Sequence, residues 1–264
     1  MSADALPAPF DLGRLPTAPT PEADKAASRA LIDALGEELA HQQELLYANR
    51  RHSLLVILQG LDAAGKDNTI RRVFAYTSPS SLAVHAFRAP NTEELAHDFL
   101  WRIHRRLPER GQIGIFNRSH YEALVYDTAQ GLIDEAERQR RLQSIRDFER
   151  HLVGSGTLVC KFFLNIGKAQ QKQRLIERIT DRSKHWKLGP DDLKVRRDFD
   201  RYMTLWSETL AATHTTDAPW HVIPADDRSY RDFNVLTVLV NTLRALRMEF
   251  PPLDPALRPE DVAD

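Results

Sequence analysis

Short apolar runs alternate with longer segments of helical spacing along most of the chain. Five runs are too apolar to alternate with polar positions and predict buried strands; these are residues 53–58, 83–87, 112–116, 157–166 and 219–225. Segments with helical spacing predict helices around them; these are residues 22–50, 65–76, 91–107, 134–153, 168–180, about 193–214 and 230–248. Such strands, separated by helices, indicate a parallel sheet covered on both faces. The expected fold is α/β, with three layers (α/β/α) around a central five-stranded parallel sheet.

The two ends of the chain depart from this alternation. Residues 1–20 are rich in Pro and Ala and predict an extended N-terminal arm, followed by one domain at 21–250 and a tail at 251–264. The N-terminus lacks the basic and apolar regions of a secretory signal peptide. No apolar run approaches the roughly 20 residues that cross a bilayer. We therefore expect a cytoplasmic protein without a membrane partner.

Composition narrows the class of partner. The 264 residues carry 36 Lys and Arg against 37 Asp and Glu, a formal net charge of -1. There is no overall basic character, so nucleic acid is not an expected partner, and any polyanion must meet a local basic surface. The single cysteine, Cys160, lies in an apolar run and is expected to be buried rather than paired.

A glycine-rich loop stands between the first strand and the next helix, in the stretch LLVILQGLDAAGKDNTIRRVF at 54–74. Its G-x-x-x-x-G-K pattern in this strand–loop–helix context predicts a phosphate-binding loop. The glycines let successive N–H groups face a phosphate, and the lysine adds a point charge. The candidate phosphate-binding residues are Gly60, Ala63, Ala64, Gly65, Lys66 and Asp67. Two carboxylates are unusual in such a loop: Asp62, and Asp67 where Ser or Thr normally holds magnesium. A plain glycine turn with a solvated lysine is the alternative.

A second polar cluster, GIFNRSHYEALVYD at 114–127, follows the third strand. Ligands of open parallel sheets bind beyond the carboxyl ends of the strands, so this cluster should share a crevice with the loop. Asn117, Arg118, Tyr121 and Glu122 would face it. Asn117 offers no charge to a metal, and Asp62 would then be the magnesium ligand beside bound phosphates. The alternatives are a cap for Asn117, a packed ring for Tyr121 and a surface charge for Arg118.

Positive charge concentrates at residues 168–201, where eleven Lys and Arg face six Asp and Glu. The polar core of this segment, RITDRSKHWKLGPDD, interrupts the helical period at Gly189 and Pro190. We expect a mobile helical lid at about 178–200 that brings cations over the site. A solvated, charged helical hairpin is the alternative. Arg88, after the second strand, would extend the basic surface.

Several motifs occur together and in order. These are GLDAAGKDNTI, HDFLWRIHRRLPERGQIGIFNRS, FNRSHYE, FERHL, KFFLNI, KHWKL and APWHVIPADDRSYRDFNVL. From about Leu45 to Leu246 the chain resembles the polyphosphate kinase 2 family. The resemblance implies a P-loop kinase fold with a helical lid and a loop of the form G-x-D-x-x-G-K, in which Asp62 is expected. It implies reversible, Mg²⁺-dependent transfer of the terminal phosphoryl group of inorganic polyphosphate to a nucleotide, with Mn²⁺ as a possible substitute. FNRSHYE is similar to the subgroup (class III) that accepts both AMP and ADP.

The resemblance also implies roles. Lys66 and the loop amides would hold the reacting phosphoryl group, Asp62 would bind Mg²⁺ with help from Asn117, and Arg118 would contact phosphate. The lid cations that would close on the transferring group are Arg178, Arg182, Lys184 and Lys187. The residues that would position AMP, ADP or ATP are Arg88, Asn117, Tyr121 and Glu122. Since relatives assemble as dimers or tetramers, a homo-oligomer is expected.

Two positions depart from the family pattern: Asn68, often Gly in relatives, and Asp127, which makes its region more acidic. Asp127 affects the expected nucleotide preference more than catalysis. Two other hypotheses stay open at this point. One is an ATP-dependent nucleoside monophosphate kinase of the same architecture, and the other is a non-catalytic protein that binds nucleotide or polyphosphate.

Overall fold

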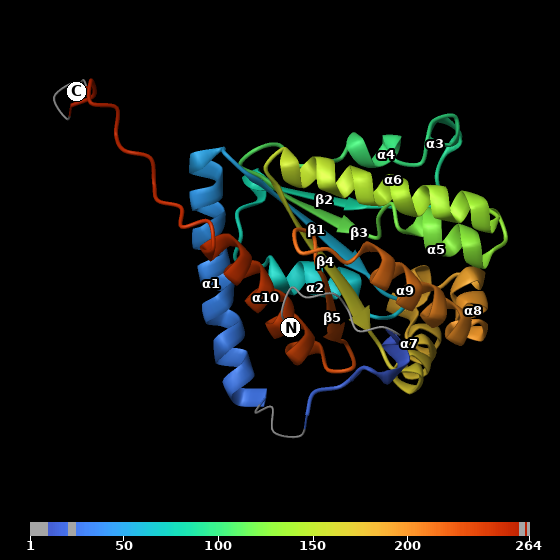
Figure 1. The fold of residues 1–264 in the computed structure, drawn as a ribbon. Helices are drawn as coiled ribbons and strands as arrows, with labels where there is room; N and C mark the ends of the chain where they lie inside the picture. The colour runs from blue at the N-terminus through green and yellow to red at the C-terminus, as the bar shows by residue number, and fades with distance from the viewer. Residues whose placement is uncertain (1–9, 21–24, 259–261, 263–264) are drawn as a thin grey trace.

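A computed structural model describes residues 10–20, 25–258 and 262. Its centre is a five-stranded sheet, all parallel, in the order β2-β3-β1-β4-β5 (Figure 1). The strands are β1 (Ser53–Gln59), β2 (Leu82–Ala86), β3 (Ile113–Asn117), β4 (Thr157–Asn165) and β5 (Trp220–Pro224). The predicted central five-stranded parallel sheet is thus confirmed.

Strand β1 is the middle of the sheet and is buried along its whole length. Its last residues pair with both neighbours, Leu58 with Asn117 of β3 and Gln59 with Phe163 of β4. The segments that follow β1 and β3 therefore leave the sheet side by side. This register places the glycine-rich loop next to the polar cluster that begins at Asn117.

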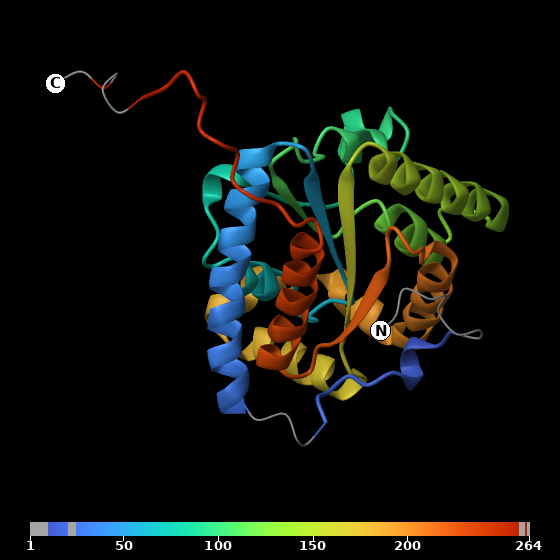
Figure 2. The ribbon, with the colours of Figure 1, turned by 60° about the vertical axis from the view of Figure 1, so that its left-hand side comes forward.

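Helices cover both faces of the sheet (Figure 2). One layer consists of α1 (Lys25–Asn49), α2 (Lys66–Val73) and α10 (Arg228–Arg244). The other consists of α5 (Glu122–Ala129), α6 (Glu135–Gly154) and α9 (Phe199–Thr213). Two further helices, α7 (Lys168–Thr180) and α8 (Pro190–Arg197), lie near the carboxyl end of the sheet, joined by the 3₁₀ helix η3 (Arg182–Lys187). The three-layer prediction is confirmed.

The prediction of one helix over 91–107 is wrong. Two single-turn helices stand there, α3 (Thr92–Leu95) and α4 (Trp101–His104). The break has a local cause at Asp98, whose carboxylate accepts from the N–H of Leu100 at 2.9 Å while its carbonyl accepts from Trp101 at 3.1 Å. An aspartate that bonds its own downstream backbone starts a new turn instead of continuing a helix. Helix α5, which begins within the polar cluster at Glu122, was not predicted.

Residues 10–20 of the N-terminal arm pack against the domain. Leu12 is fully buried, and the N–H of Asp226 donates to the carbonyl of Thr17 at 2.8 Å. The side-chain amide of Asn165, at the end of β4, donates to the carbonyls of Leu12, Leu15 and Pro16 at 3.3–3.4 Å. The first nine residues of the predicted arm lie outside the described part.

The other end of the chain behaves differently, since residues 251–258 run away from the body of the domain (Figure 1). Cys160 is buried in β4, as expected. In the described part of the chain, no helix combines the length and apolarity needed to cross a bilayer.

Candidate functional site

The glycine-rich loop has an unusual backbone. Gly60, Ala63 and Gly65 have φ values of 142°, 65° and 110°, and α2 starts at the next residue, Lys66. An alanine in the left-handed region costs roughly 1–2 kcal/mol and persists only where neighbouring groups hold it. The surroundings of the loop must therefore stabilise this conformation.

Those surroundings bind the carbonyl oxygens of the loop from one side. The amide of Gln171 donates to the carbonyl of Asp62 at 3.0 Å, and the guanidinium of Arg174 donates to Ala63 and Ala64 at 3.0 and 3.1 Å. In a trans peptide unit the N–H points away from the carbonyl. The N–H groups of Ala63 and Gly65 thus face away from these side chains, as an anion-binding loop requires.

Lys66 lies inside the loop, with 8% of its surface exposed. Its Nζ donates to the carbonyls of Gly60 at 2.6 Å and Leu61 at 3.3 Å. Burial, together with the positive charge of Arg118, lowers the pKa of Lys66 to about 8, while the charge of Asp62 opposes the shift. A buried ammonium of this kind gains stability from any anion that enters the loop.

The two predicted clusters meet at the carboxyl end of the sheet, where the expected crevice would lie. A guanidinium nitrogen of Arg118 lies 2.5 Å from a carboxylate oxygen of Asp62, and another lies 4.0 Å from Glu122. Arg118 has a φ of 63° and its N–H donates to the carbonyl of Leu58, which extends the ladder between β3 and β1. Burial raises the pKa of Glu122, and the charge of Arg118 counteracts this.

Asn117 and Asp67 also meet at this edge of the sheet. The side-chain amide of Asn117 donates to a carboxylate oxygen of Asp67 at 2.5 Å. Asp67 is exposed at the start of α2, where a negative charge suits the positive end of the helix. Asp67, which stands where Ser or Thr is usual, is therefore the hydrogen-bond acceptor for the Asn117 amide.

The predicted lid consists of η3 and α8. Arg178, near the end of α7, donates to the carbonyl of Lys187 at 3.1 Å and lies 3.6 Å from Asp192 of α8. Lys184 pairs with Asp181 at 2.9 Å, the Lys187 ammonium stacks over Trp186, and Arg182 is exposed. The structure thus places these four lid cations in contacts within the lid or at its surface.

Two nucleotide-binding candidates lie elsewhere. Tyr121 is fully buried, and its hydroxyl donates to a carboxylate oxygen of Glu149 at 2.7 Å. Tyr121 therefore fits the packed-ring alternative, and its prediction as a nucleotide contact is wrong because the side chain is buried in the core. Arg88 is exposed after β2, and its carbonyl accepts from Arg102 at 2.9 Å.

Sequence reasoning missed four residues around the loop. Gln171 and Arg174 have been described; Arg231 of α10 donates to the carbonyl of Ala64 at 3.4 Å and to Asp232 at 2.7 Å. The fourth, Asp192 of α8, accepts from the N–H of Gly189 at 2.7 Å and lies 3.6 Å from Arg178; burial and the charge of Asp62 raise its pKa. The spacing of residues 171, 174 and 178 on one face of a helix was the available signal for the first two.

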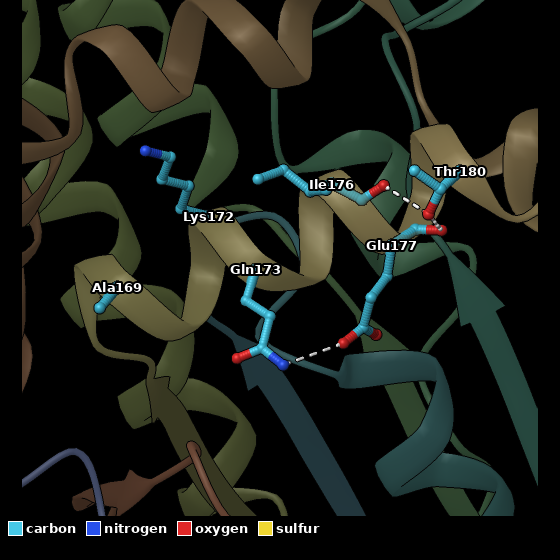
Figure 3. A pocket seen from close by; sticks show the side chains of 6 residues that line it. All are labelled: Ala169, Lys172, Gln173, Ile176, Glu177 and Thr180. Carbon is cyan, nitrogen blue, oxygen red and sulfur yellow. Dashed lines mark hydrogen bonds between the residues drawn. The ribbon is translucent and has the colours of Figure 1, made fainter.

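A shallow hollow of about 350 Å³ lies on the other face of α7 (Figure 3). Its lining residues are Ala169, Lys172, Gln173, Ile176, Glu177 and Thr180, with a bond of 3.4 Å from the Gln173 amide to Glu177. None of its lining residues belongs to the phosphate loop or to the Arg118 cluster, so the hollow is separate from the crevice.

Comparison with known proteins adds to this geometry. Residues 22–251 match the family model "Polyphosphate kinase 2 (PPK2)". The chain belongs to the polyphosphate kinase 2 family. The resemblance drawn from the motifs is thereby confirmed, and the matched range spans the strands, the loop and the lid.

Individual relatives agree along almost the whole length. An AMP/ADP-polyphosphate phosphotransferase of Meiothermus ruber is 44% identical over 230 residues, covering 87% of this chain and 86% of that protein. An ADP-polyphosphate phosphotransferase of Rhodopseudomonas palustris is 39% identical over 263 residues, covering 95% and 91%. The crystal structure of polyphosphate kinase 2 from Arthrobacter aurescens superposes with a TM-score of 0.92 at 38% identity, covering 97% of this chain and 93% of that one.

Proposed function

We propose that this protein transfers the terminal phosphoryl group of inorganic polyphosphate to AMP, ADP or both, reversibly. The observation that carries the proposal is the juxtaposition of buried Lys66 with the Asp62–Arg118 ion pair at the carboxyl end of β1 and β3. Relatives with polyphosphate phosphotransferase names, 44% and 39% identical, support it.

The chemistry requires charge neutralisation and alignment more than covalent catalysis. A P–O–P bond at the end of polyphosphate breaks, and a terminal phosphate oxygen of the nucleotide forms a new bond to the transferred phosphorus. Lys66 and the loop N–H groups hold oxygens of that phosphoryl group, and Arg118 exchanges part of its contact with Asp62 for a phosphate oxygen. Arg178, Arg182, Lys184 and Lys187 approach the polyanion when the lid closes. Lys66 and Arg118 are already held in place, and the lid would add cations where negative charge accumulates.

The donor set fits magnesium bound jointly with substrate. Among the described residues, no group of three or more His, Cys, Asp and Glu side chains forms a metal cage. Mg²⁺ commonly binds through one or two carboxylates and substrate phosphates instead, and the Asp62 carboxylate belongs to the loop itself, where it is paired with Arg118. We propose that Asp62 holds Mg²⁺, or Mn²⁺, with Asn117 assisting. When bound, the ion would neutralise phosphate charge.

Nucleotide choice follows from the second cluster. Asn117 and Glu122 stand at the crevice in the FNRSHYE motif and support acceptance of both AMP and ADP, and exposed Arg88 is a further candidate contact. The proposal includes a cytoplasmic location and a homo-oligomer of two or four subunits.

A luciferase assay tests the proposal. The protein is incubated with Mg²⁺, long-chain polyphosphate and either ADP or AMP, and the ATP formed is measured. We expect ATP in both arms, none without polyphosphate, and at least about a 100-fold loss with Lys66→Met. ADP formation from ATP plus AMP, without a polyphosphate requirement, would instead identify an ATP-dependent monophosphate kinase. Binding of either substrate without turnover would identify a non-catalytic protein.

A further inference from the structure

Gln171 of α7 links the phosphate loop to the lid. It is fully buried, its amide nitrogen donates to the carbonyl of Asp62 at 3.0 Å, and its amide oxygen accepts from the guanidinium of Arg196 at 3.1 Å. A guanidinium only donates hydrogen bonds, so the orientation of the amide is fixed by Arg196. Arg196 lies on α8, the helix of the lid, and Asp62 is the loop carboxylate of the site.

Arg174, one turn further along α7, binds the loop more extensively. One guanidinium nitrogen donates to Ala63 and Ala64 at 3.0 and 3.1 Å, and another donates to Ala225 and Asp226 at 2.9 and 2.7 Å. It is buried with 7% of its surface exposed, and its bonds join the loop to the segment after β5. Its contacts are with backbone carbonyls, and they hold Ala63 in the left-handed region.

The helix that makes these contacts leads directly into the lid. Gln171, Arg174 and Arg178 lie on one face of α7, and Arg178 already contacts η3 and lies near α8. A shift of α8 on substrate binding therefore reaches Gln171 through Arg196, and reaches the Asp62–Ala63 peptide through Gln171. The path consists of two hydrogen bonds.

We propose that Gln171 and Arg174 are positioning residues for phosphoryl transfer, and that Gln171 couples lid closure to the orientation of the Asp62–Ala63 peptide. Neither residue touches substrate. They set the direction of the loop N–H groups and of the Asp62 side chain, so their loss reduces turnover with polyphosphate. This inference rests on the proposed function and adds to it a route by which the lid controls the loop.

The test is a double-mutant cycle on kcat and KM for polyphosphate. Gln171→Leu keeps the size of the side chain and removes both bonds, and we expect a loss of at least about tenfold in kcat/KM, mostly in kcat. Arg196→Leu removes the lid end of the path. Both variants break the same path, so kcat/KM of the double variant should equal that of Gln171→Leu within about twofold. A loss in the double variant equal to the product of the two single losses would show that the residues act independently and would overturn the coupling.

Two further variants separate position from fold. Gln173→Leu makes the same chemical change on the outer face of α7, where Gln173 is exposed, and should leave kcat within about twofold. Gln171→Glu still accepts from Arg196 but cannot donate to Asp62, so it should be as impaired as Gln171→Leu. Wild-type kcat in Gln171→Glu would overturn the role assigned to the bond with Asp62. Arg174→Lys retains the charge but cannot bridge four carbonyls, and wild-type kcat in that variant would overturn its role.

A binding readout keeps this inference distinct from the proposed function. Trypsin cleavage after Arg182, Lys184 or Lys187 reports lid opening, since Arg182 is exposed and the other two are half-buried. Polyphosphate should protect the wild type against it, and at saturating polyphosphate Gln171→Leu should still be cleaved at least about tenfold faster than the wild type, because binding no longer closes the lid. A wild type that is protected but makes no ATP would contradict the proposed function alone. Equal protection of both proteins would contradict the coupling. Circular dichroism melting checks that each variant is folded.

Discussion

Raising the pH from 7 to 9 should weaken polyphosphate binding through Lys66 alone. Burial lowers the pKa of this lysine from 10.5 to about 8 in the ligand-free protein. An anion in the loop favours the protonated form, so the bound state holds this proton more tightly than the free state. Binding is therefore strongest below pH 8 and weakens as the pH rises through 8, because a proton must then be taken up on binding.

The magnitude comes from the two pKa values. If bound phosphates return the pKa of Lys66 to near its ordinary value of 10.5, Kd rises about tenfold between pH 7 and pH 9. At pH 8 binding should take up about half a proton per site. The inner phosphate groups of the chain are strong acids and stay ionised in this range.

Isothermal titration calorimetry with polyphosphate measures both quantities. Kd is determined from pH 7 to 9, and proton uptake at pH 8 is obtained from buffers of different ionisation enthalpy. Lys66→Arg is the matched control, because a guanidinium stays charged throughout this pH range. The Kd of the Lys66→Arg protein for polyphosphate should therefore be nearly independent of pH. A flat Kd in the wild type, or an equal slope in Lys66→Arg, would refute the reasoning.

Three further changes have expected outcomes. Asp62→Asn should lower kcat at least about 100-fold in the luciferase assay; near-normal turnover would contradict its metal role. Gly65→Ala would place a Cβ 2.1 Å from a guanidinium nitrogen of Arg231 at a φ of 110°, so polyphosphate binding should be lost, and an unchanged Kd by calorimetry would contradict this loop geometry. Lys161→Met should lower the free energy of unfolding in urea by about 3–5 kcal/mol, since Glu149 lies buried 2.5 Å from the ammonium. Adding Glu149→Gln should recover most of that loss, and a larger loss in the double variant would count against the account.

The layers and the loop could be predicted from sequence because their signals are local. Five apolar runs and a G-x-x-x-x-G-K pattern between strand and helix are each readable within a few residues. The meeting of Asp62 with Arg118 required one more rule, that adjacent parallel strands end at the same edge of the sheet. The pairing of Leu58 with Asn117 provides that geometry.

The remaining contacts are set by tertiary structure and gave no local signal. The position of Tyr121 within the FNRSHYE motif predicts a site residue. Its hydroxyl instead lies in a buried cluster with Glu149 of α6 and Lys161 of β4. Gln171 and Arg174 are polar positions that helical spacing places on one face of a helix with Arg178, but nothing in the sequence says which loop carbonyls they meet. The turn at Asp98 escaped detection since the apolar spacing continues across it.

The most direct test of the central claim is a ³¹P NMR time course with the protein, Mg²⁺, AMP and polyphosphate as the sole phosphoryl donor. We expect the AMP signal to decline while the ADP signals rise, and the Lys66→Met protein to leave the AMP signal unchanged. An AMP signal that stays constant with the wild type until ATP is added would contradict the account.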